Sequence, residues 1–300
     1  MSVHELTRPL TLEWPAESLG NLPLALEQLH HWAQITPLQT ALRHKRQGQW
    51  YAWRWIDALR DVERLADGLR QQGFDEQSRL ALSGAFEPNL LLLALAAQSV
   101  GAPVLTLADD LPLEALQQQL WRIRPTHGYV QSRQQARHWQ SIQRLDFAQL
   151  LGPIDPAQHV QRWWRPTGDT ALWSEEGTHW QGGLAVVLEQ WLSSGHGLAF
   201  PESPASARRD RSEVAPTGLL LSPSRLQHLA DDIESRLAPL GTWRRRLCDW
   251  AIAHPQSGLR RVLKNRVRRL LGFQRLAYIW QPLKTSAEPT WLAEFKRDIA

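Results

Sequence analysis

Few groups of residues in this sequence have the types and spacing that chemistry at a site requires. The pair His30-His31 has no third candidate ligand at a useful spacing, so we expect no metal site there. Ser194 to Gly197 contains a Gly-x-Gly pattern, but it follows a predicted helix, which favours a helix cap over a dinucleotide loop. Ser83-Gly84 follows a predicted strand without the second glycine of a nucleophile elbow, and no Ser/His/Asp triad can be assembled. We therefore predict no catalytic residue from these patterns.

The elements that would position a site are clearest between Thr36 and Leu107. Two strand-like runs, Thr40 to Lys45 and Gln49 to Trp53, flank a turn in which Gly48 can take positive φ. A helix with an apolar face follows and ends near Gly73. Pro88 and Gly101 then bound a second helix, which lies between two further strands at residues 79–83 and 103–107.

Strands and helices continue to alternate along the rest of the chain. The patterns predict helices at 113–124, 131–140, 183–193, 223–237, 242–253 and 258–271, and strands at 127–130, 197–200, 217–221 and 277–280. Residues 201–211 read as a polar loop. This order predicts an α/β fold with doubly wound, mostly parallel sheets and flanking helices, in which the strands of the first half form one sheet.

The predicted domains are an N-terminal extension and two α/β subdomains. The extension covers residues 1–20, and the subdomains cover 21–150 and 151–300, with a Pro- and Gly-containing boundary at 151–165. Sixteen tryptophans are present, and we expect most of them, including Trp50, Trp53 and Trp55, in the core. The single cysteine, Cys248, the absence of a long apolar run and an N-terminus unlike a secretory signal favour a cytoplasmic location.

The net charge of +4 is concentrated in a basic helical segment, residues 243–275, where ten Lys and Arg accompany one Asp. In 258–271 the apolar and basic residues can separate onto two faces. Such a helix could bind an anionic membrane surface, or it could be a domain helix with a solvated basic face. No recognised nucleic-acid motif accompanies the charge, so no nucleic-acid partner is expected.

The stretch from Thr36 to Leu107 resembles the opening of AMP-forming acyl-CoA synthetases, and most closely their long-chain fatty-acid branch. The residues that carry the resemblance are Thr36-Pro37, Gly48-Gln49-Trp50, Leu65-Ala66-Asp67-Gly68-Leu69, Gly73, Glu87-Pro88 and Gly101-Ala102. In the second half, Glu213 to Thr217 and Ser222 to Arg225 resemble a later segment of the same adenylate-forming ligases. The resemblance covers most of Thr36 to Ala300 and implies the family's fold and its use of ATP, Mg²⁺ and CoA.

The resemblance places the family's phosphate-binding loop at Asp169 to Gly182. Four residues fall near family positions that surround the ATP phosphates and are the candidate cofactor-binding residues: Ser174, Gly177, Thr178 and Gly182. Gln181 stands where the family has lysine, and no lysine occurs between Lys45 and Lys264.

Two glutamates make this loop a poor phosphate site. Glu175 and Glu176 would each repel a triphosphate that they faced, by on the order of 1 kcal/mol per charge pair. The loop is then at most a degenerate remnant of a phosphate loop, and we favour the alternative, an ordinary exposed turn that opens the helix from Gly183.

These features predict a truncated acyl-CoA synthetase-like pseudoenzyme that cannot adenylate fatty acids alone. The family's C-terminal ligase domain would lie beyond Ala300, so we expect no cofactor for this chain by itself. An accessory or acyl-binding role beside a full-length synthetase would fit. One alternative is the front half of a split long-chain fatty-acid–CoA ligase that a partner completes. Another is a peripheral membrane or lipid-handling protein that uses residues 258–271.

Overall fold

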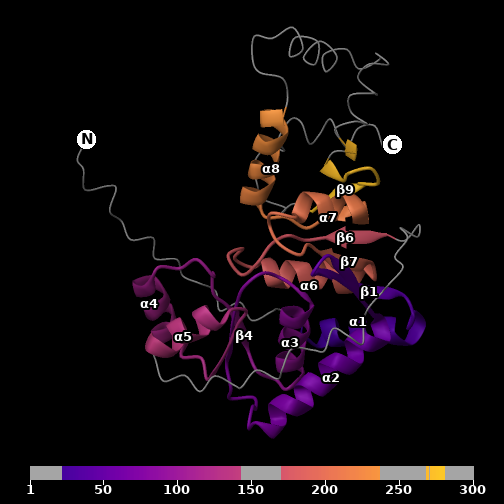
Figure 1. Ribbon diagram of the computed structural model, residues 1–300. Coiled ribbons are helices and arrows are strands. Elements are labelled where there is room, and N and C mark those ends of the chain that lie inside the picture. Colours follow the sequence, from indigo (N-terminus) through magenta and orange to yellow (C-terminus); the bar gives the residue numbers. More distant parts are fainter. Residues whose placement is uncertain (1–21, 143–169, 237–267, 270, 281–300) are drawn as a thin grey trace, which may run out of the picture.

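The computed structural model describes residues 22–142, 170–236, 268–269 and 271–280 (Figure 1). The helices in these ranges are α1 (Leu22–Ile35), α2 (Trp55–Gln71), α3 (Pro88–Ser99), α4 (Leu113–Ile123), α5 (Arg133–Ile142), α6 (Gly183–Ser194), α7 (Ala207–Val214) and α8 (Pro223–Arg236). The strands are β1 (Thr40–Arg46), β2 (Gln49–Arg54), β3 (Leu80–Ser83), β4 (Val104–Thr106), β5 (His127–Val130), β6 (Ala171–Trp173), β7 (Gly197–Phe200), β8 (Gly218–Leu219) and β9 (Tyr278–Ile279). The predicted α/β class is confirmed.

Two sheets with helices on both faces organise these elements. The larger sheet has six strands in the order β2-β1-β7-β6-β8-β9, and all neighbours are parallel except the β1–β2 hairpin. The smaller sheet has three parallel strands in the order β4-β3-β5. Helices α1, α2, α3 and α6 pack between the sheets, α7 and α8 cover the outer face of the larger sheet, and α4 and α5 cover the outer face of the smaller one (Figure 1).

The hairpin near the start of the chain forms as predicted but joins a distant partner. Gln47 and Gly48 both have positive φ, at 49° and 74°, and form the two-residue turn between Arg46 and Gln49. Strand β1 then pairs in parallel with β7, so that Leu42 lies opposite Leu198. The sequence order placed the hairpin with the strands of the first half, whereas the structure makes it part of the sheet of the second half.

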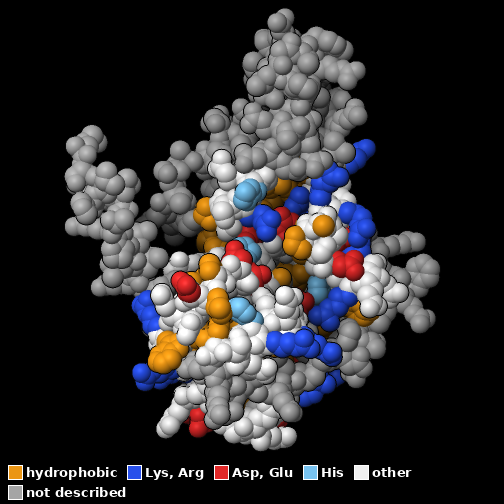
Figure 2. Space-filling view, turned by 60° about the vertical axis from the view of Figure 1, so that its left-hand side comes forward, with side chains coloured by type: hydrophobic (Ala, Val, Ile, Leu, Met, Phe, Trp, Pro, Cys, Tyr) orange, Lys and Arg blue, Asp and Glu red, His pale blue; other side chains and the backbone are white. Residues whose placement is uncertain are grey.

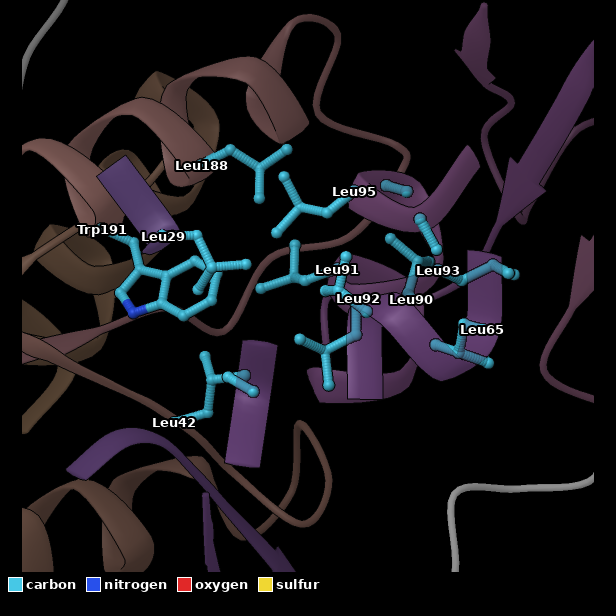
Figure 3. Packing of buried hydrophobic residues seen from close by; sticks show 14 of the residues in the cluster. Leu29, Leu42, Leu65, Leu90, Leu91, Leu92, Leu93, Leu95, Leu188 and Trp191 are labelled. Carbon is cyan, nitrogen blue, oxygen red and sulfur yellow. The ribbon is translucent and has the colours of Figure 1, made fainter. Parts of the chain in front are cut away.

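The core between the sheets is built around α3, whose leucines lie near Leu188 and Trp191 of α6 (Figure 3). Every residue of α3 from Leu90 to Gln98 is buried, because this helix is covered on all sides. Trp55 and Trp191 stack with ring centroids 5.3 Å apart, and the Trp191 Nε1–H donates to the Ala41 carbonyl at 3.0 Å. Trp53 and Trp55 are 1% and 0% exposed, which confirms their predicted place in the core, whereas Trp50 is only partly buried.

Two helices were not expected from the sequence. Helix α7 occupies part of the stretch read as a polar loop, so that prediction was wrong. Its buried residues include Asp210 and Arg211, whose charges are neutralised by partners elsewhere, so no apolar period marks this helix. Helix α1 was also not predicted, although its Leu29 is completely buried.

Several predicted features lie outside the described residues. These are the extension 1–20, the boundary 151–165, the helix at 242–253, and all of 258–271 except residues 268, 269 and 271. The subdomain division and the membrane-binding helix therefore stay predictions. None of the helices in the described part of the chain is long and apolar enough to cross a membrane.

Candidate functional site

The loop from Ser174 to Gly182, which we call the strap, joins the carboxyl edges of the two sheets. It follows β6 and leads into α6, and it lies against residues 84–87, which follow β3 in the smaller sheet. The Thr178 N–H donates to the Gly84 carbonyl at 2.8 Å, and the Gly84 N–H donates to Thr178 Oγ1 at 2.9 Å. The Phe86 N–H donates to the Glu176 carbonyl at 2.8 Å. The strap is thus paired like a short strand with the loop that precedes α3.

Two glycines allow this close approach. A Cβ atom on Gly177 would lie 2.7 Å from the Gly84 carbonyl oxygen, so a side chain there would force the two loops apart. Gly84 has a φ of 141°, and a Cβ there would lie 2.5 Å from the side chain of Gln131. The Gln131 amide in turn accepts from the Ala85 N–H at 2.9 Å and donates to the Ala85 carbonyl at 2.6 Å. The end of β5 therefore holds the same loop from its other side.

Glu176 is completely buried beneath the strap. Its Oε1 accepts hydrogen bonds from the Ser222 N–H at 2.8 Å and the Ser222 hydroxyl at 2.9 Å, and its Oε2 lies 3.0 Å from His179 Nε2. Burial by itself raises the pKa of Glu176, but the bonds from His179 and Ser222 outweigh it and hold this pKa below its usual value. The bond to Glu176 raises the pKa of His179.

Glu175 also points toward the protein. Its Oε2 accepts from Trp173 Nε1 at 3.1 Å and from Arg211 Nη1 at 2.9 Å. Arg211 is almost fully buried, donates from Nε to the Leu271 carbonyl at 2.8 Å and lies 4.8 Å from the centre of the Phe273 ring. Both glutamates are therefore held by internal partners.

The four predicted cofactor-binding residues all lie on the strap, but they do not form an open cradle. Ser174 is buried, and its hydroxyl has no hydrogen-bond partner among the described residues. Gly177 and Thr178 take part in the pairing with Gly84, and Gly182 takes a φ of 70° before α6. The alternative of an ordinary exposed turn is wrong, because only His179 and Gln181 are exposed on the strap.

Three backbone N–H groups of the strap, those of Ser174, Thr178 and Trp180, donate to acceptors within the protein. Besides the Thr178 N–H, the Trp180 N–H donates to the Gly177 carbonyl at 3.0 Å, and the Gly183 N–H donates to the Trp180 carbonyl at 2.9 Å. Phosphate loops hold their ligand with N–H groups that have no intramolecular acceptor. The N–H groups of Thr178 and Trp180 therefore are not free to hold a ligand in this conformation of the strap.

A buried ion pair that the sequence did not reveal ties the hairpin to α7. Lys45 Nζ lies 2.9 Å from Asp210 Oδ1 and 2.6 Å from Glu213 Oε2, and it is 5.5 Å from the centre of the Trp50 ring. Burial lowers the pKa of Lys45, but the bonds to Glu213 and Asp210 raise it by a larger amount, so the net shift is upward. The partners lie more than 160 residues apart in the chain, and no local pattern could have paired them.

A second buried polar group lies between the two sheets. Arg46 donates from Nη2 to Glu87 Oε2 at 3.3 Å and from Nε to His44 Nδ1 at 3.1 Å, and the Tyr129 hydroxyl donates to Glu87 Oε1 at 3.5 Å. Burial, aided by the charge of Arg46, lowers the pKa of His44 to about 3, so its imidazole is neutral. Burial raises the pKa of Glu87. These hydrogen bonds connect β1 with the N-terminal end of α3 and with β5, and so they hold the two sheets together.

Among the described residues, no three His, Cys, Asp or Glu side chains lie close enough together to hold a metal ion.

The family model described as "AMP-binding enzyme" matches residues 29–186, more than half of the chain. A search of curated proteins finds no match.

Solved structures of adenylate-forming ligases share the fold. VinN is 13% identical with a TM-score of 0.55, and the match covers 71% of this chain and 64% of VinN. The R395G form of coronafacic acid ligase from Pectobacterium brasiliense is 12% identical with a TM-score of 0.55, over 70% of this chain and 52% of the ligase. A putative long-chain-fatty-acid CoA ligase from Rhodopseudomonas palustris is 15% identical with a TM-score of 0.53, over 69% and 65%. This chain thus spans less than two thirds of each of these proteins.

The strap geometry predicts a cost for removing one hydroxyl. Thr178→Val keeps the shape of the side chain but leaves the buried Gly84 N–H without its acceptor, so we expect the free energy of unfolding to fall by about 1–3 kcal/mol. Urea denaturation monitored by tryptophan fluorescence would measure this loss. Thr106→Val on β4 is the matched control, since the Thr106 hydroxyl makes no hydrogen bond in the described structure. Equal losses in the two variants would contradict a tie between the sheets at Thr178.

The His179–Glu176 pair predicts a pH dependence of stability. The folded-state pKa of His179 lies above its usual value of 6.5, so protonated His179 stabilises the fold below that pH, and this contribution is lost as the pH rises through the raised pKa. We expect His179→Gln to lower the free energy of unfolding more at about pH 5.5 than at about pH 9. Urea unfolding across this range would measure the difference.

The matched control for this pH dependence is the same substitution in a Glu176→Gln background, where the trend should largely disappear because its main cause is absent. A destabilisation by His179→Gln that grows with pH would contradict the pairing.

Proposed function

Since the chain belongs to the AMP-binding enzyme family, we propose that it is a ligase-like protein that does not form an acyl adenylate on its own. The strap carries this proposal. Adenylation requires a loop whose N–H groups meet the phosphates of ATP, usually with a lysine beside them. Here the N–H of Thr178 bonds to Gly84, and Gln181 occupies the place of the lysine.

Opening the strap for a nucleotide would break more than one kind of contact. The three hydrogen bonds to Gly84 and Phe86 would be lost, each with a net contribution of about 0.5–1.5 kcal/mol. Glu176 would also lose its bonds to Ser222, and a buried carboxylate without its donors is strongly unfavourable. ATP would have to supply this free energy from contacts that the strap does not offer.

We assign the protein an accessory role beside a complete long-chain fatty-acid ligase in the cytoplasm. The sequence resemblance to the long-chain branch supports the choice of partner. In the described part of the chain, β2 forms one edge of the larger sheet, and an unpaired strand edge favours association with another chain. ATP, Mg²⁺ and CoA would then bind to the partner ligase.

A second candidate is the front part of a split ligase. The matched region covers only 64% of VinN and 52% of coronafacic acid ligase, so a second chain could supply the rest of such a structure. This candidate differs from the accessory role because it requires ATP turnover to appear only when both chains are present.

The proposal predicts no pyrophosphate from the purified protein with ATP, Mg²⁺ and fatty acids of several chain lengths. Gln181→Lys should also stay inactive, because the lysine alone does not free the amides of the strap. A coupled pyrophosphate assay would measure both, with an active acyl-CoA synthetase as the positive control. Pyrophosphate release by the chain alone would overturn the proposal.

Mixing the protein with a chain that encodes only the later part of a ligase separates the two candidates. Turnover in the mixture would favour the split ligase. Stimulation of a ligase that is already complete would favour the accessory role.

A further inference from the structure

A pocket opens at the carboxyl edge of the larger sheet, between α7 and α8 on the outer face. Helix α6, which follows the strap, lies on the inner face. The chain leaves β6 toward α6 on the inner face of the sheet, but it leaves the neighbouring strands β7 and β8 toward α7 and α8 on the outer face. In open α/β sheets, a crevice forms where the connections of adjacent parallel strands diverge in this way, and ligands bind there. The pocket lies at this point and has a volume of about 350 Å³.

The wall of this pocket is strongly basic. Arg208 and Arg211 line it from α7, and Arg225 and His228 line it from α8. In each pair the residues are three apart, so both side chains lie on the same side of their helix. The two helices therefore present four basic side chains to one space. Figure 2 shows Lys, Arg and His side chains close to acidic ones on the upper part of the coloured surface.

Only part of this positive charge is neutralised. Glu175, the one acidic residue of the wall, is bonded to Arg211. Arg208 and Arg225 make no ion pair in the described part of the chain, and Arg225 is only partly exposed. By contrast, the adjacent Arg209 lies 3.3 Å from Asp210 and 3.8 Å from Glu202 and does not line the pocket. Among the described residues, two guanidinium groups of the wall therefore have no acidic partner.

The rest of the wall is apolar and includes the start of α7. Pro204, Ala205, Ala207 and Leu229 supply it. The first turn of α7 also holds Asp210, but this carboxylate is buried and bonded to Lys45, so it does not line the pocket. The volume is in the range of pockets that hold small organic ligands, and it is larger than a single inorganic anion needs.

We propose that this pocket binds a small organic molecule that carries a phosphate group, with the phosphate between Arg208 and Arg225 and the apolar part against Ala207 and Leu229. Guanidinium groups bind phosphate with paired, charge-assisted hydrogen bonds, which are stronger than neutral ones. The inference goes beyond the proposed function, because it involves neither the amides of the strap nor a partner chain.

Isothermal titration calorimetry with phenyl phosphate tests the pocket, and inorganic phosphate and benzoate serve as comparison probes. We expect phenyl phosphate to bind more tightly than either, since only it combines the phosphate with an apolar group. Arg208→Ala and Arg225→Ala should each weaken its binding about tenfold or more, and high salt should weaken it further.

The matched control is Arg209→Ala, which removes the same charge from the same helix and should change the affinity less than about twofold, since its charge is already paired. Thermal melts and circular dichroism would confirm that the three variants fold alike. No binding of phenyl phosphate, or an equal loss in Arg208→Ala and Arg209→Ala, would overturn the proposal. If inorganic phosphate bound as tightly as phenyl phosphate, the proposed apolar part of the ligand would be wrong. If benzoate bound as tightly as phenyl phosphate, the proposed preference for a phosphate group would be wrong.

Discussion

The pairing between Thr178 and Gly84 is the contact on which the arrangement of the two sheets depends. It brings the loop after β6 and the loop after β3 together, with two hydrogen bonds between these residues and a third from Phe86 to Glu176. Since a Cβ on Gly177 would lie 2.7 Å from the Gly84 carbonyl oxygen, the contact exists only with a glycine at this position. Glu176 extends the tie to the start of α8 through Ser222. One short loop thus connects both sheets with the helix layer on the outer face.

Paired charges add to the apolar contacts on the outer face of the larger sheet. Asp210 and Arg211 are buried on α7, where they meet Lys45 and Glu175 from other elements. Removing one partner of such a pair leaves an uncompensated buried charge, which costs about 3–5 kcal/mol. These pairs therefore fix where α7 lies, although the helix has few apolar residues. Arg208 and Arg225, which make no ion pair with a described residue, line the pocket between α7 and α8.

This chain shares its fold with adenylate-forming ligases. Yet in this chain the small residues Ser174, Gly177 and Thr178 serve packing and hydrogen bonding within the protein. Glycine is needed both for a loop that wraps a phosphate and for a loop that touches another backbone. The same residue types can therefore support two functions, and the direction of the N–H groups decides between them.

The sequence by itself determined most of the local structure, with α1 and α7 as exceptions. Turn chemistry at Gly48 and the glycine after α2 predicted element ends, and the apolar periods predicted α2, α3 and α6 and most of the strands. The family resemblance also placed Ser174, Gly177, Thr178 and Gly182 on one loop before a helix. The sequence could not give α7, because partnered charges replace the apolar period there. Only the tertiary structure decided that β1 pairs with β7, that Glu175 and Glu176 point inward, and that the strap is closed. Each of these depends on partners distant in the chain, and local propensity contains no information about which distant group a side chain or an amide will meet.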